Sequence, residues 1–156
     1  MAGNKQKKET LNHTLSVIVR LLHANGFKKW FIGYGTLLGI VREHSCIEGD
    51  DDVYIVICQS EASRLKEMLV NNNFSLQIGS KTIVKTRHTA EYASIDFYLA
   101  PVDEEGSFHD KHDDILWSKC YTNVSECTLI QVPWRGQTLF QPNNFEKKLE
   151  NCYGDW

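Results

Sequence analysis

The sequence has no apolar run that approaches the ~20 residues of a membrane-spanning helix. Residues 1–10 are polar and carry lysines, without the apolar stretch of a signal peptide. The five cysteines are odd in number and show no C-x-x-C spacing, so neither a disulfide framework nor a zinc site is indicated. These absences predict a cytoplasmic protein with reduced thiols and no membrane span.

An excess of positive charge is also missing. The chain has 17 Lys and Arg against 20 Asp and Glu, a formal net charge of −3. Nucleic-acid-binding proteins are usually basic, so we expect no nucleic-acid partner. The sequence has no internal repeat and no low-complexity segment, and its 156 residues suit a single core. We therefore expect one domain over residues 1–156.

The hydrophobic pattern predicts a mixture of helices and strands. We expect helices over residues 8–25, 37–42, 61–70 and 115–120, with Thr36 and Ser60 as helix caps. Strands are expected over residues 27–32, 50–57, 74–78, 81–87 and 92–99, with a polar loop over 101–114 and a hairpin over 129–140. A last helix follows Asn143, which forms a capping box with Glu146, and turns Cys152 and Tyr153 to the core. The fold class is α/β: a small mixed sheet packed by helices.

The stretch Trp30–Ile57, "WFIGYGTLLGIVREHSCIEGDDDVYIVI", organises the chain. It reads as a strand, a glycine-rich turn, a short helix and an acidic strand. Gly33 and Gly35 permit close backbone approach, and the free N–H groups at a helix start favour phosphate. Arg42 adds a guanidinium that can bind phosphate in bidentate fashion. Taken singly, the glycines are also compatible with an ordinary turn and Arg42 with a surface arginine.

The acidic strand that follows carries three consecutive aspartates. On a strand, Asp50, Asp52 and Tyr54 share one face. Like charges side by side are unfavourable unless a cation neutralises them, although an acidic turn in solvent is the simpler alternative. A phosphate cradle next to paired carboxylates is the layout of metal-dependent phosphoryl or nucleotidyl transfer.

A single aspartate, Asp96, stands in the middle of the apolar strand "ASIDFYLA". Aspartate is depleted in strands, so this one requires a partner. In one interpretation it forms a salt bridge with Lys85 or Arg87 across a hairpin. In the other, which we favour, strand pairing brings it beside Asp50 and Asp52 as a third metal-binding or basic carboxylate.

The segment "GTLLGIVR" at Gly35–Arg42, followed at fixed distance by Asp50, resembles the core motif of the LicD/fukutin-like phosphotransferases. The closing "QPNNFEKKLENCYGDW" is similar to the end of that family's domain. The resemblance spans residues 30–156. One position departs from the family pattern: Tyr54 stands where the family has a third strand aspartate.

The resemblance implies a nucleotidyltransferase-type fold and transfer of a phospho-alcohol group, such as phosphocholine or an alditol phosphate. The donor would be a CDP-activated alcohol and the acceptor a hydroxyl of a glycan or glycolipid. It implies Mg²⁺ or Mn²⁺ on Asp50, Asp52 and Asp96, and a phosphate held by Gly33, Gly35, Thr36 and Arg42. The alternatives are nucleotidyl transfer from an NTP, and a catalytically weakened protein that only binds nucleotides, which Tyr54 makes credible.

Overall fold

A five-stranded sheet in the order β1-β2-β5-β4-β3 forms the centre of the molecule in the computed structural model, which describes residues 5–156. Its strands are β1 (Trp30–Ile32), β2 (Asp52–Cys58), β3 (Leu76–Gly79), β4 (Ile83–Thr86) and β5 (Ser94–Ala100). β2 and β5 are parallel and the other neighbours are antiparallel. The predicted α/β class with a mixed sheet is confirmed.

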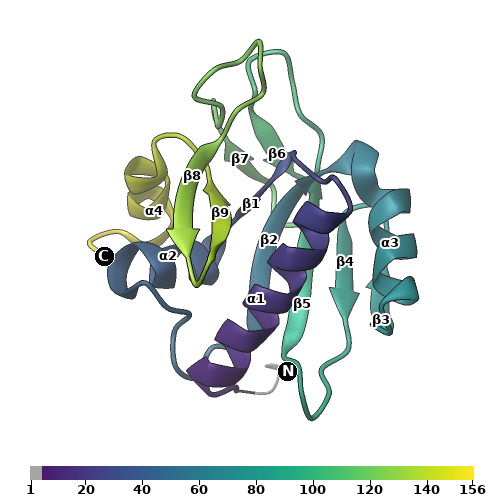
Figure 1. Ribbon diagram of the computed structural model, residues 1–156. Coiled ribbons are helices and arrows are strands. Elements are labelled where there is room, and N and C mark those ends of the chain that lie inside the picture. Colours follow the sequence, from purple (N-terminus) through teal and green to yellow (C-terminus); the bar gives the residue numbers. More distant parts are fainter. Residues whose placement is uncertain (1–4) are drawn as a thin grey trace.

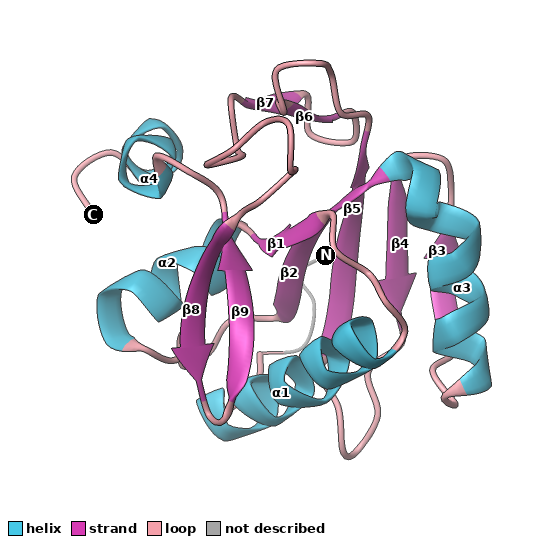
Figure 2. Ribbon diagram, turned by 45° about the horizontal axis from the view of Figure 1, so that its top comes forward, coloured by secondary structure: helices cyan, strands magenta, loops and turns pink. Residues whose placement is uncertain are grey.

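The helices are α1 (Lys8–Ala24), α2 (Tyr34–Glu43), α3 (Ala62–Asn71, after the 3-10 turn η1, Gln59–Glu61) and α4 (Phe145–Tyr153). α1 and α3 lie on the same side of the sheet, toward the viewer in Figure 1 and again in Figure 2. The hairpin β8 (Ile130–Trp134) and β9 (Gln137–Gln141) packs against β1 and α1. Within residues 5–156, no helix has the length and apolar character needed to cross a membrane.

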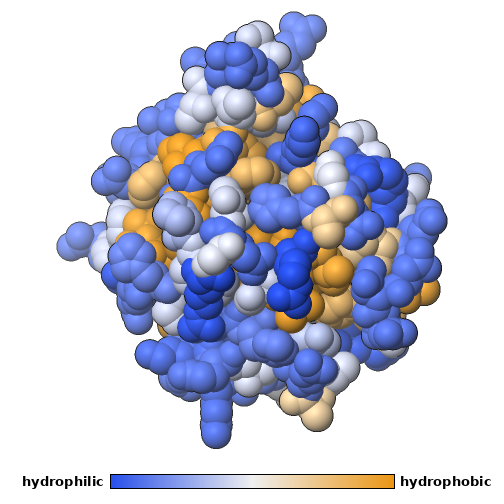
Figure 3. Space-filling view, in the orientation of Figure 1, coloured by the Kyte–Doolittle hydropathy of each residue, from blue (hydrophilic) through white to orange (hydrophobic). Residues whose placement is uncertain are grey.

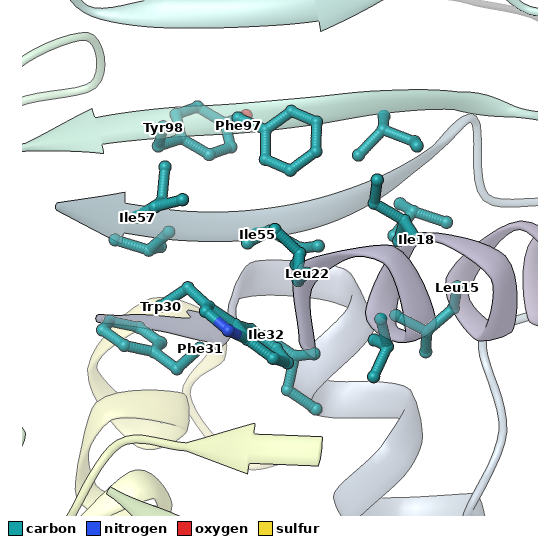
Figure 4. Close-up of a cluster of buried hydrophobic side chains, with 14 of the residues drawn as sticks. Leu15, Ile18, Leu22, Trp30, Phe31, Ile32, Ile55, Ile57, Phe97 and Tyr98 are labelled. Carbon is teal, nitrogen blue, oxygen red and sulfur yellow. The ribbon is translucent and has the colours of Figure 1, made fainter. Parts of the chain in front are cut away.

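The main core lies between α1 and the central strands. Leu15, Ile18 and Leu22 face Ile55 and Phe97, and all of them are fully buried (Figure 4). Each such side chain stabilises the fold by roughly 1.5–3 kcal/mol relative to an exposed one. On the outer surface of this side, hydrophobic residues appear only in separate patches among hydrophilic ones (Figure 3). Because side chains alternate along a strand, the neighbours of these core residues point to the other face of the sheet.

The segment after β5 differs from its prediction. Residues 115–120, expected as a helix, form strand β7 (Ile115–Trp117), and the expected loop contains its partner β6 (Phe108–Asp110). Phe108 and Trp117 are paired across this hairpin and both contact the ring of Phe31. A segment of six residues is too short for its periodicity to separate helix from strand, so packing against the sheet decides.

The predicted helix caps are wrong. α2 begins one residue after Gly33, and none of α2, α3 and α4 has a side-chain capping hydrogen bond at its start. The Ser60 hydroxyl lies 3.1 Å from the sulfur of Cys58, before the helix. Cys152 and Tyr153 are exposed and not in the core, whereas the stem of Lys148 is buried beside Leu149. Tertiary packing of the apolar face therefore fixes these helices without the expected caps.

Candidate active site

Two glycines let neighbouring side chains approach the backbone closely at the start of α2. A Cβ on Gly33 would lie 2.9 Å from Cγ2 of Val56, so this residue packs on the core. A Cβ on Gly35 would lie 2.5 Å from Oδ2 of Asp50, so the backbone of α2 directly faces that carboxylate. The hydroxyl oxygen of the buried Thr36 accepts the N–H of Tyr54 (2.9 Å), which joins α2 to β2.

Asp50 lies in the loop between α2 and β2, because β2 begins at Asp52 and not at the predicted residue 50, and α1 holds that loop in place. The buried side chain of Asn12 accepts the N–H of Cys46 and donates to Oγ of Ser45, both at 2.9 Å. The backbone of Gln6 pairs with Gly49 and Asp50 at 2.9 Å. These contacts fix the position of the Asp50 carboxylate beside the start of α2.

Tyr54 occupies the centre of the acidic face. Its hydroxyl lies 3.3 Å from Oδ1 of Asp50, which also accepts the N–H of Asp51 at 3.0 Å. Burial raises the pKa of Tyr54 strongly, and the charges of Asp50, Asp52 and Asp96 raise it further. The phenol is therefore a neutral donor among three acids. Burial also raises the pKa of Asp50.

Asp96 and Asp52 share one cationic partner. Asp96, on β5, lies opposite Tyr54 of the parallel strand β2 and opposite Lys85 of the antiparallel strand β4. The Lys85 ammonium contacts Oδ1 of Asp96 at 2.8 Å and Oδ1 of Asp52 at 3.0 Å. The salt bridge to Lys85 and the approach of Asp96 to Asp52 are thus present together, while the Asp50 carboxylate lies against the Tyr54 hydroxyl.

The charged side chains in this group change one another's pKa values. Burial raises the pKa of Asp96 to about 6, and Asp52 contributes in the same direction while Lys85 opposes it. The pKa of Lys85 is also raised, because hydrogen bonds and charge from Asp96 and Asp52 outweigh the effect of its burial. The ammonium thus stays charged and is the counter-ion of the pair.

A cavity of about 460 Å³ opens beside Gly35 and Asp50. Aromatic rings form much of its wall: it is lined by Tyr34, Gly35, Leu38, Ile47, Glu48, Gly49, Asp50, Tyr54, Tyr98 and Tyr153. The Tyr34 hydroxyl donates to the buried carboxylate of Asp110, and its ring lies 4.9 Å from that of Tyr98. Sequence reasoning missed these rings, although alternation along β5 places Tyr98 on the face of Asp96.

Arg42 is not among the cavity residues. It lies on the last turn of α2, with its side chain 42% exposed and 3.7 Å from the Glu43 carboxylate. Gly39, on the same helix, is covered by the carbonyl of Ser45, which would lie 2.4 Å from an added Cβ. A phosphate contact by Arg42 stays a prediction, and it requires a ligand that extends along α2.

The acidic face offers few side chains that could hold a metal ion. Among residues 5–156, no three His, Cys, Asp or Glu side chains form a group that could hold one. Asp52 and Asp96 nevertheless converge on one cation, the Lys85 ammonium, with oxygens of the kind that Mg²⁺ and Mn²⁺ prefer. The pair suits a divalent ion whose remaining ligands come from a bound phosphate or water.

The mixed sheet, with an acidic strand next to a glycine turn and a short helix, defines a nucleotidyltransferase-like fold. The lincomycin-bound lincosamide antibiotic adenylyltransferase LnuA has a similar structure, with a TM-score of 0.59 over 94% of this chain and 86% of that one. The two sequences are 13% identical, so the likeness concerns the fold. The sequence model of the LicD/FKTN/FKRP nucleotidyltransferase domain matches residues 28–144, and the chain belongs to this family. No curated protein matched the sequence.

Proposed function

We propose that the protein is a metal-dependent phosphotransferase that moves a phospho-alcohol group from a CDP-activated donor to a glycan or glycolipid hydroxyl. Membership of the family supports a transferase of this type. The observation that carries the proposal is the cavity beside Gly35, whose wall joins bare backbone to the Asp50 carboxylate and includes Tyr54, the cross-strand neighbour of Asp96.

In this proposal the residues of the site have separate roles. Asp52 and Asp96 would hold Mg²⁺ or Mn²⁺ together with Asp50 or phosphate oxygens, and the ion would offset the negative charge of the leaving phosphate. Gly35 would let the diphosphate approach the start of α2, where N–H groups favour anions, while Gly33 and Thr36 would hold that turn against the core and β2. Asp50 or Asp96 would accept the proton of the attacking hydroxyl, because a carboxylate with a raised pKa is the stronger base.

The tyrosine-lined wall of the cavity favours a donor that carries a planar or cationic group. Flat aromatic faces stack on nucleobases and attract quaternary ammonium groups, while the phenol oxygens bind polar edges. Tyr34, Tyr54 and Tyr98 are in ring contact with one another on this wall. A cytidine base, with or without a choline group, matches that chemistry.

Nucleotidyl transfer from an NTP is the second candidate. It would use the same acidic face, but the nucleotidyl group of an NTP would pass to the acceptor and diphosphate would leave. The adenylyltransferase LnuA shares the fold, which supports testing ATP and CTP beside the CDP-alcohols.

A thermal-shift screen tests the proposal. CDP-choline, CDP-ribitol, CTP and ATP are added to the full chain, each with and without Mg²⁺. We expect the CDP-alcohols to raise the melting temperature more with Mg²⁺ than without it, because a ligand that binds only the folded state stabilises it. The effect should vanish in Asp52→Asn and persist in Asp51→Asn, because Asp51 is the sequence neighbour of Asp52 and alternation turns its side chain to the other face. A response to NTPs alone would favour nucleotidyl transfer, and no response to any nucleotide would contradict both candidates.

A further inference from the structure

The Lys85 ammonium occupies the point where two carboxylates from neighbouring strands converge. β4 supplies the lysine, β2 supplies Asp52 and β5 supplies Asp96, so three adjacent strands fix the arrangement. The side chains are 19%, 11% and 9% exposed, respectively. Such shielding from water makes the attraction stronger than that of a surface pair.

We propose that Lys85 is a resident counter-ion that competes with a divalent metal ion for Asp52 and Asp96 and thereby sets the metal affinity of the site. The inference rests on the proposed function in one respect, that a metal ion acts at this face. An ammonium and a metal ion cannot share the point between the two Oδ1 atoms, because like charges repel at contact distance. Metal binding therefore requires the ammonium to leave both carboxylates.

The geometry separates Lys85 from an ordinary structural lysine. A cross-strand salt bridge needs one acid, and Asp96 opposite Lys85 would suffice. Lys85 instead reaches a second acid, Asp52, two strands away in the sheet order. Lys81 and Arg87, which flank it in the sequence, are exposed. Lys85 alone of these three is placed to neutralise the pair.

When a nucleotide is bound, the displaced Lys85 ammonium can contact another anion. The flexible four-carbon stem of lysine lets its head group turn toward a new anion without movement of the backbone. Phosphate oxygens of a donor bound with the metal ion supply that anion, whereas the metal ion alone supplies none. Metal and nucleotide should therefore bind cooperatively in the wild-type chain, and the cooperativity should depend on Lys85.

Mn²⁺ binding to the full chain tests this inference, by electron paramagnetic resonance and calorimetry without nucleotide. We expect Lys85→Met to bind Mn²⁺ about tenfold more tightly than the wild type, since removal of a close competing charge is worth at least that factor. Lys85→Arg, which keeps the charge, and Lys81→Met, the exposed control, should stay within about twofold of the wild type. Asp52→Asn combined with Lys85→Met should cancel the gain.

Unchanged or weaker Mn²⁺ binding by Lys85→Met would overturn the inference. Because unpaired carboxylates can destabilise this variant, its melting temperature is also measured. We expect it to melt below the wild type in EDTA and to gain more from Mn²⁺ than the wild type does. If Lys85→Met does not fold, Lys85→Gln is measured against the same expectations.

Nucleotide titrations distinguish a failure of this inference from a failure of the proposed function. Absence of CDP-alcohol binding by the wild type would contradict the proposed function even if Lys85→Met gains Mn²⁺ affinity. Normal CDP-alcohol binding together with an unchanged Mn²⁺ affinity in Lys85→Met would overturn only the role of Lys85.

Discussion

At the scale of single residues, Gly35 most sharply limits what the site tolerates. Its Cα faces the Asp50 carboxylate so closely that a methyl group would overlap Oδ2. Gly35 also lines the cavity, so any side chain here both displaces Asp50 and takes up space beside α2.

Gly35→Ala should therefore abolish Mg²⁺-dependent nucleotide binding while the fold survives, because alanine is a better helix former than glycine. Calorimetry with CDP-choline and Mg²⁺ measures the affinity, and thermal unfolding measures stability. Gly79→Ala is the matched control, since a Cβ there makes only ordinary contacts, the nearest at 3.8 Å. Wild-type affinity in Gly35→Ala would remove this backbone from the binding site.

Tyr54 is the residue at which the sequence departs from the family pattern. Tyr54→Asp restores a third acid on the face of Asp52 and should tighten Mn²⁺ binding. It should also lower the melting temperature in EDTA, because one ammonium then balances one more partly buried carboxylate. Tyr54→Phe separates charge from packing: it should leave metal affinity near that of the wild type. Equal Mn²⁺ affinity in all three proteins would show that this position does not face the ion.

At the scale of elements, the loop before β2 depends on α1. Asn12 is 2% exposed and makes two hydrogen bonds to the loop that leads to Asp50. Asn12→Ala leaves the buried N–H of Cys46 without this acceptor, which costs about 1–3 kcal/mol of unfolding free energy. Nucleotide affinity should fall as well, because Asp50 loses its support.

Urea unfolding and CDP-choline titration check this expectation. Asn25→Ala, at the exposed end of the same helix, is the control and should cost less than Asn12→Ala. A stability loss in Asn12→Ala with unchanged nucleotide affinity would mean that the loop does not position Asp50 for binding.

The sequence predicted the elements whose pattern is long and regular. Apolar residues at helical spacing identified α1, and alternation along β5 puts Asp96 on the face opposite that of Phe97, whose ring lies toward α1 (Figure 4). Strand order could not be read from such patterns, so the choice between a salt bridge and a carboxylate pair stayed open. The answer required three strands to be placed side by side, since Lys85 contacts both acids. Short segments such as 115–120 were missed because contacts distant in sequence determine them.

At the scale of the whole molecule, burial predicts how the thiols react. Cys46, Cys58 and Cys120 are buried, Cys127 is partly buried and Cys152 is exposed. Burial raises the pKa of Cys46 and of Cys120 to about 12, so thiolate is scarce there at pH 8.

A disulfide exchange reagent at pH 8 should therefore modify Cys152 first and Cys127 more slowly, and all five thiols only in denaturant. Mass spectrometry of the partly modified chain identifies the sites. Rapid modification of Cys46 or Cys120 in the native protein would contradict the packing of α2 and β6 around them.

The fold brings an acidic face, a bare backbone and an aromatic cavity together, and we propose that group transfer from a CDP-activated alcohol takes place there. Release of CMP from CDP-choline and CDP-ribitol, as the phospho-alcohol group passes to an added sugar hydroxyl or to water, is followed by chromatography with and without Mg²⁺ and tests this claim most directly. We predict Mg²⁺-dependent CMP release by the wild type, lost in Asp52→Asn and in Asp96→Asn. CMP release by neither donor, or equal release by the wild type and both variants, would contradict the account.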